Sequence, residues 1–175
     1  MPGTEHRKLA AIMFTDMVGY SALAQRNEGL ALELLEEHHR ILRGILPKYA
    51  GREVKTTGDG FLLEFPSALA AVKCGVDIQE ALHQRNQLCP AERRVRIRIG
   101  IHVGDVITRG DDIHGDGVNI GARLEPLAAP GGICVSEDVA RQARNKLPHQ
   151  LVTIGPGELK HIDLPVVICR VVLPW

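Results

Sequence analysis

The chain has 175 residues, of which 45% are hydrophobic and 24% charged, a composition typical of one globular domain. Lysine plus arginine balances aspartate plus glutamate at 21 each and aromatic residues are only 3%, which argues against a nucleic-acid or anionic-membrane partner. No apolar run reaches the roughly 20 residues of a membrane span, and no signal peptide is evident, so we expect a single cytoplasmic domain over residues 1–175.

The first predicted elements are a strand and a helix. The apolar run KLAAIMF, residues 8–14, has the length of a buried strand, and the stretch FTDMVGYS places Asp16 where that strand ends. From Asn27, a possible N-cap, the apolar residues follow a helical spacing that a proline at position 47 closes. A carboxylate is therefore expected at the end of the first strand.

The stretch EVKTTGDGFLLEF, residues 53–65, predicts a β-hairpin. Glycines on both sides of Asp59 permit turn dihedrals that other residues avoid, and they leave its carboxylate unshielded. Such a carboxylate suits an ion or a phosphate better than a hydrophobic core. An ordinary hairpin with an aspartate in its turn explains this stretch alone at least as well.

A second helix and a long strand follow the hairpin. Ser67 can cap a helix that fades by residue 86, and RVRIRIGIHV, residues 94–103, alternates basic and apolar side chains as a strand does. The order of these elements is that of a ferredoxin-like βαββαβ core, an α+β fold with helices on one face of an antiparallel sheet. Additional C-terminal strands and helices are expected in this order: a strand at 105–109, a loop GDDIHGDGVN, a helix at 118–127, a strand at 133–136, a helix at 137–144 and a hairpin of 151–154 with 166–173.

Asp16 and Asp59 can meet in such a fold, because the first strand is central and the hairpin turn can approach its end. Two adjacent carboxylates repel each other unless a cation lies between them. Hard oxygen ligands with room for water and phosphate oxygens suit Mg²⁺ or Mn²⁺. From spacing alone, the alternative makes Asp16 a helix cap and Asp59 a turn residue.

The segments FTDMVGYS and KTTGDGF together resemble the two metal-binding segments of the class III adenylate and guanylate cyclase catalytic domain. The resemblance continues through RIRIGIHVGDV and DDIHGDGVNIGARLE, and it covers nearly the whole chain in the right order. That family has a ferredoxin-like core with extra elements, in agreement with the order predicted above. A diguanylate cyclase is a weaker alternative, because its GG(D/E)EF-type turn differs from GDGF.

The resemblance implies which residues would hold the metal and the triphosphate. Asp16 and Asp59 match the two metal carboxylates, and Arg98 matches a triphosphate-binding arginine. The family commonly adds a lysine from a late loop, which here reads TIGPGELKH, with Pro156 at the simplest alignment of that lysine. Lys160 is close by, but its register is open, and it is left out of the expected site.

The resemblance also implies which residues would hold the nucleoside. Lys55 and Asp112 match the pair that reads the purine, and an ammonium donor with a carboxylate acceptor suits adenine. Asn119 matches the residue that orients the ribose. Arg123, one helical turn later, matches the arginine that stabilises the transition state.

The implied reaction converts ATP to 3′,5′-cyclic AMP and pyrophosphate, with two Mg²⁺ or Mn²⁺ ions assisting attack of the ribose 3′-hydroxyl on the α-phosphate. The implied assembly is a head-to-tail homodimer with two shared sites. One chain would supply the metal carboxylates and Arg98, and its partner the other four residues. Regulatory domains outside the chain are implied as well. A catalytically weak or inactive cyclase-like nucleotide-binding module is the alternative, which a turnover assay distinguishes.

Overall fold

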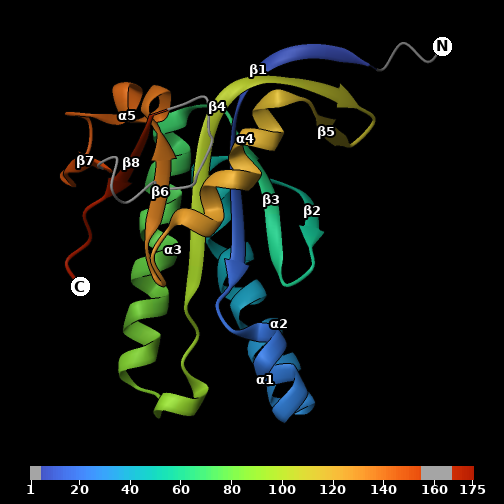
Figure 1. The fold of residues 1–175 in the computed structure, drawn as a ribbon, viewed down its shortest axis with the longest axis vertical. Helices are drawn as coiled ribbons and strands as arrows, with labels where there is room; N and C mark the ends of the chain where they lie inside the picture. Colours follow the sequence, from blue (N-terminus) through green and yellow to red (C-terminus); the bar gives the residue numbers. More distant parts are fainter. Residues whose placement is uncertain (1–4, 155–166) are drawn as a thin grey trace.

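The computed structural model describes residues 5–154 and 167–175, and its strands form one twisted sheet of eight strands (Figure 1). The strands are β1 (His6–Met17), β2 (Arg52–Thr57), β3 (Gly60–Phe65), β4 (Ile97–Arg109), β5 (Asp112–His114), β6 (Ile133–Ser136), β7 (Leu151–Thr153) and β8 (Ile168–Val171). The helices are α1 (Tyr20–Arg26), α2 (Glu28–Ile45), α3 (Ala68–Gln87), α4 (Asp116–Leu124) and α5 (Glu137–Ala143), with short 3₁₀ turns η1 (Leu46–Tyr49), η2 (Ala91–Arg93) and η3 (Glu125–Leu127).

The antiparallel part of the sheet has the strand order β2-β3-β1-β4, and its connections through α2 and α3 are those of a ferredoxin-like core. β6 pairs in parallel with β4, and the β7–β8 hairpin extends the sheet beyond β6. The prediction of an α+β fold, with a ferredoxin-like core and additional C-terminal elements, is therefore confirmed.

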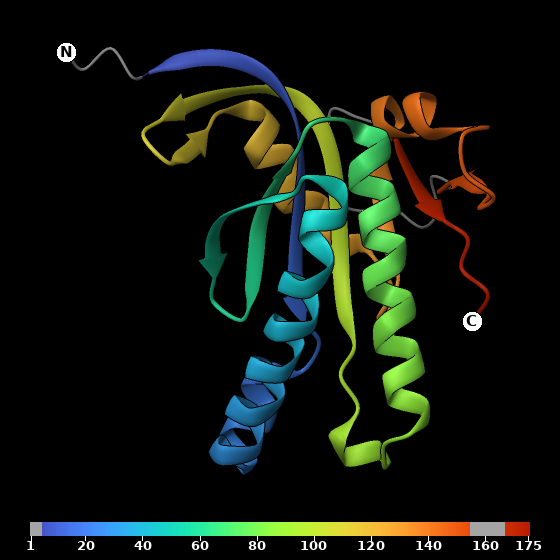
Figure 2. The same ribbon diagram turned by 180° about the vertical axis from the view of Figure 1, so that it is seen from behind.

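The two faces of the sheet carry different helices. α2 and α3 cover the face seen in Figure 2, where they bury the apolar side chains of β1, β3 and β4 in the main core. α4 lies across β1 and β4 on the face seen in Figure 1. Gly121 allows α4 to pack closely, because a Cβ there would lie 3.0 Å from Cδ1 of Ile12 and 3.2 Å from Cδ2 of Phe14.

Both predicted helix caps are present. The Asn27 side chain accepts a hydrogen bond of 3.1 Å from the Leu30 N–H at the start of α2. The Ser67 hydroxyl accepts one of 3.0 Å from the Ala70 N–H at the start of α3. Among the helices of residues 5–154 and 167–175, none is long and apolar enough to cross a membrane.

Three local predictions were wrong. β4 is one strand through Gly104, which pairs with Ala10 of β1, so that 105–109 is not a separate strand. Residues 112–114 lie in β5, paired with the end of β4, and not in a loop. The helix α1 was not expected, because it has no buried residue and hence no apolar face to give a helical pattern.

Candidate functional site

Two backbone contacts bring Asp16 and Asp59 to one edge of the sheet. Asp16 lies near the end of β1, opposite Arg98 of β4, and Asp59 lies in the turn between β2 and β3. A Cβ at Gly60 would lie 1.6 Å from the Thr15 carbonyl oxygen, so only glycine lets the turn approach β1 this closely. The Phe61 N–H also donates to the Thr15 hydroxyl at 3.1 Å.

A third carboxyl group, that of Glu125, lies beside these two. A Cβ at Gly100 would lie 2.4 Å from the Glu125 backbone nitrogen, so η3 rests directly on β4 and buries Glu125 to 8% exposure. Burial first, and then the adjacent Asp16, raise the pKa of Glu125 to about 8, and Arg98 opposes this shift. Glu125 was not among the residues expected from the sequence.

The carboxyl groups of Asp16, Asp59 and Glu125, which we call the acidic edge, are incompletely satisfied by the surrounding protein. Burial and the charge of Asp16 raise the pKa of Asp59 above its ordinary value, although the Met17 N–H opposes the shift. Oδ1 of Asp16 and Oε2 of Glu125 are buried and have no hydrogen-bond partner among the described residues. A buried, unpaired carboxylate oxygen is costly unless a cation or a proton reaches it.

This donor set fits a divalent cation that retains other ligands. Asp16 and Asp59 supply hard oxygen atoms of the kind that Mg²⁺ and Mn²⁺ prefer. Within residues 5–154 and 167–175, no three His, Cys, Asp or Glu side chains form a group that could hold a metal ion. A bound ion would therefore complete its coordination with water, backbone carbonyl or phosphate oxygens.

Arg98 extends from β4 on the same edge of the sheet. Its Nε donates to the Ala128 carbonyl oxygen at 3.0 Å, which ties the guanidinium to the segment after η3. Its charge acts on the neighbouring Glu125 carboxyl. Arg98 therefore lies close to the acidic edge.

Lys55 and Asp112 come together from two different strands. A register shift in β2 between Glu53 and Lys55 places Lys55 opposite Leu62, and its Nζ lies 3.2 Å from Oδ2 of Asp112 in β5. Burial is the largest single influence and raises the pKa of Asp112, but the Ile113 N–H, Lys55 and His114 together lower it below the ordinary value. A donor and an acceptor are therefore held side by side, both largely open to solvent.

His114 also approaches this pair, although the family resemblance assigns it no role. Its Nε2 lies 3.5 Å from Oδ2 of Asp112, and its side chain is 46% exposed. The other histidine near the motifs, His102, is buried on β4 and its Nδ1 lies 2.8 Å from the Ser136 hydroxyl. His102 is therefore a packing residue of the fold.

Asn119 and Arg123 are exposed on α4, four residues apart and thus on one helix face. Together with Asp116 and Ile120 they line an open cavity of about 300 Å³. Neither side chain belongs to the apolar surface with which α4 packs on the sheet. The helix therefore presents both of them away from its own core.

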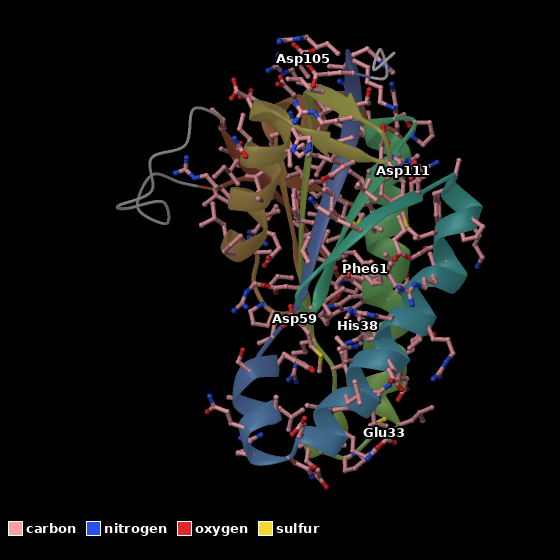
Figure 3. The ribbon with its side chains drawn as sticks, turned by 90° about the vertical axis from the view of Figure 1, so that its right-hand side faces the viewer. Glu33, His38, Asp59, Phe61, Asp105 and Asp111 are labelled. Atoms are coloured by element: carbon pink, nitrogen blue, oxygen red, sulfur yellow. The ribbon has the colours of Figure 1, made fainter. Side chains whose placement is uncertain are left out.

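The seven expected residues thus form three groups within one chain. The first contains Asp16, Asp59 and Arg98, the second contains Lys55 and Asp112, and the third contains Asn119 and Arg123. Figure 3 shows Asp59 at the turn of the β2–β3 hairpin, beside His38 and Phe61, whereas Asp111, the neighbour of Asp112, lies near the other end of that hairpin. The late-loop positions Pro156 and Lys160 lie outside the described residues.

Comparison with known proteins gives a consistent family assignment. The family model of the adenylate and guanylate cyclase catalytic domain matches residues 4–161. The chain is 39% identical over 161 residues to a putative adenylate cyclase 3 of Rhizobium meliloti (strain 1021), an alignment that covers 91% of this chain and 27% of that protein. The chain therefore spans about a quarter of the length of this relative.

Solved structures show the same fold. An adenylate/guanylate cyclase/hydrolase from Silicibacter pomeroyi superposes with a TM-score of 0.87 at 37% identity, covering 97% of this chain and 99% of that one. The adenylyl cyclase CyaB from P. aeruginosa superposes with a TM-score of 0.78 at 26% identity, covering 98% and 97% of the two chains. Both similarities extend over essentially the full length of each structure.

Proposed function

The chain belongs to the adenylate and guanylate cyclase catalytic domain family, and from this premise we propose that it converts ATP to 3′,5′-cyclic AMP and pyrophosphate. The observation that carries the proposal is the approach of the Asp16 and Asp59 carboxylates at the end of β1, beside Arg98. We also propose that residues 1–175 form one catalytic domain, which acts as a homodimer.

The acidic edge is the proposed metal and triphosphate site. Asp16 and Asp59 hold Mg²⁺ or Mn²⁺, which when bound would lower the pKa of the ribose 3′-hydroxyl and offset the charge of the triphosphate. Arg98 binds the β- and γ-phosphate oxygens, and its hydrogen bond to the Ala128 carbonyl oxygen fixes where the guanidinium lies.

The Lys55–Asp112 pair is the proposed reader of the base. The Lys55 ammonium can donate to a ring nitrogen of adenine, while the Asp112 carboxylate accepts from the exocyclic amine. Guanine presents the opposite pattern of donor and acceptor. The 3.2 Å contact between the two side chains supports this role, because a planar base edge needs both groups close together.

The exposed face of α4 is the proposed ribose and transition-state site. Asn119 orients the ribose so that its 3′-hydroxyl is in line with the α-phosphorus. Arg123, one turn along the same face, stabilises the charge that develops on the α-phosphate. Both side chains line the open cavity that a partner chain can complete.

We propose that each site is shared between two chains. One chain supplies Asp16, Asp59 and Arg98, and the partner supplies the base and ribose residues. Figure 3 shows Asp59 at the turn of the β2–β3 hairpin and Asp111, which immediately precedes β5, towards the other end of that hairpin, and this separation supports the arrangement. A monomer is then expected to be nearly inactive.

The first test is a product assay with ATP and GTP, each with Mg²⁺ and Mn²⁺, over a range of protein concentrations. We expect cyclic AMP from ATP, with a specific activity that rises with protein concentration as dimers form. Binding of ATP without product under either metal would instead favour a nucleotide-binding module that does not catalyse. Cyclic GMP as the main product would refute the assignment of the base-reading pair.

The second test mixes two inactive variants, Asp59→Ala and Arg123→Ala. If sites are shared, each mixed dimer contains one intact site and one site that lacks both groups. Random pairing of equal amounts makes about half of the dimers mixed, so we expect about a quarter of the wild-type rate. A mixture as inactive as its two parents would refute the shared-site arrangement, while leaving the family assignment in place.

A further inference from the structure

A histidine on α2 contacts the turn that carries Asp59, although neither the sequence motifs nor the family comparison assigns it a role. His39 is partly buried, and its Nε2 lies 3.3 Å from the backbone carbonyl oxygen of Asp59. Since a carbonyl oxygen can only accept, the imidazole N–H is the donor. Twenty residues of chain separate the two partners, so this is a tertiary contact between α2 and the hairpin.

The His39 ring is itself held in place by packing. Its centroid lies 4.4 Å from that of Phe61 and 4.7 Å from that of His38. Phe61 is fully buried, and the Arg43 guanidinium lies 5.2 Å from its ring on the same side as α2. Figure 3 shows Asp59, Phe61 and His38 close together where α2 passes the hairpin turn.

The Gly58 side of the turn has no packing contact of its own, whereas the Gly60 side is held against the Thr15 carbonyl oxygen of β1. Gly58 has φ of 65° and open space around it, and Gly60 lacks a side chain as well. A glycine on each side gives the backbone of Asp59 a wide range of conformations. The Asp59 carboxylate accepts hydrogen bonds from the Met17 N–H and from its own backbone N–H, and the His39 side chain adds a hydrogen bond to the Asp59 backbone from a separate element, α2.

We propose that His39 is a positioning residue for the metal site: its N–H donates to the Asp59 carbonyl oxygen and fixes the direction of the Asp59 carboxylate toward Asp16. The inference rests on the proposed role of Asp59 as a metal ligand. His39 touches neither substrate nor metal in this arrangement. The hydrogen bond orders the turn before a cation binds. Binding of the cation then costs less conformational entropy.

The experiment separates the hydrogen bond from the packing of the ring. His39→Phe keeps an aromatic ring against Phe61 but removes the donor, whereas His39→Gln keeps a neutral donor and removes the ring. The dissociation constant of Mn²⁺ alone is measured for each full-length variant by electron paramagnetic resonance of the free ion. The KM for Mn²⁺ and kcat are measured in the cyclase assay, and thermal unfolding reports the fold.

For His39→Phe we expect Mn²⁺ to bind about two- to tenfold more weakly, because loss of one neutral hydrogen bond has an effect of this size. The KM for Mn²⁺ should rise by the same factor. The kcat at saturating Mn²⁺ should be nearly unchanged. His39→Gln should lie closer to wild type. His83→Phe is the matched control on α3, where the ring stacks on Trp175 far along the chain from the hairpin, and it should change neither constant.

Two results would overturn the inference. Mn²⁺ binding by His39→Phe equal to wild type would show that the donor does not position Asp59, and a loss confined to His39→Gln would assign the effect to ring packing. If His39→Phe does not fold, His39→Leu provides the donor-free variant. Asp59→Asn separates failure of the His39 inference from failure of the proposed metal site. If Asp59→Asn leaves Mn²⁺ binding unchanged, Asp59 is not a metal ligand and the proposed metal site is wrong.

Discussion

Stability below neutral pH should depend on one buried histidine, His38. It is 1% exposed on α2, and neither ring nitrogen has a hydrogen-bond partner of normal geometry among the described residues. Burial first, and then the neighbouring His39, lower the pKa of His38 to about 3, an effect that the Leu35 backbone opposes only slightly. The folded protein therefore keeps this ring neutral where the unfolded chain protonates it.

The sign and size of the effect follow from these two pKa values. The folded value of about 3 lies below the unfolded value of about 6.5, so the contribution of His38 is present above pH 6.5 and is lost as pH falls toward 3. Between pH 7 and pH 5 the loss is about 2 kcal/mol of unfolding free energy. His38→Leu has no ring to protonate and should lack this component.

Urea unfolding of wild type and His38→Leu at pH 7 and pH 5 provides the measurement. The raised pKa of Glu125 acts in the opposite direction over this range, but it contributes to both proteins and cancels in the difference. His6→Leu, at an exposed strand position, is the matched control. If wild type and His38→Leu lose the same free energy between the two pH values, the neutral buried ring is not the cause.

Three further predictions concern the site. Asp16→Asn should raise the thermal unfolding midpoint of the metal-free protein, because it removes one of two carboxylates that repel each other, and it should abolish cyclic nucleotide formation. A lower midpoint than wild type would show that this repulsion does not destabilise the fold. Gly60→Ala should cost more than about 3 kcal/mol in urea unfolding, since its Cβ would overlap the β1 backbone, whereas Gly58→Ala, in open space, should cost only about 1 kcal/mol of backbone strain. Lys55→Glu combined with Asp112→Cys should shift kcat/KM from ATP toward GTP, and an unchanged ratio would remove the reason for choosing ATP.

The ferredoxin-like core could be predicted because the spacing of apolar residues differs clearly between its strands and its helices, and because capping residues mark where the helices begin. Asn27 and Ser67 mark the starts of two long helices, and both side chains make the expected cap. The interruption expected at Gly104 was wrong because glycine marks a turn only where the backbone needs it. Here the residue pairs with Ala10 inside a long strand, where a Cβ at position 104 would lie 2.9 Å from Nε2 of His102.

The site could be predicted only where motifs mark it. Asp16, Asp59 and Lys55 stand in recognisable segments, so their residue types carry information. Glu125 and His39 have no such mark, because each matters through a contact that the fold creates. Glu125 reaches the acidic edge only because η3 rests on β4, and His39 reaches the hairpin turn only because α2 passes it.

Burial and mutual repulsion make negative charge at the acidic edge costly before any ligand binds. Asp59 and Glu125 both have raised pKa values, and a buried oxygen of Asp16 has no partner among the described residues, so ionising the edge costs folding free energy. A rigid surrounding is needed to bear that cost, and the close approaches at Gly60 and Gly100 provide it. Because a cation would offset the same repulsion, its binding and the stability of this edge must be coupled. The acidic edge is therefore less stable than its packing alone would make it, for the same reason that it suits a metal ion.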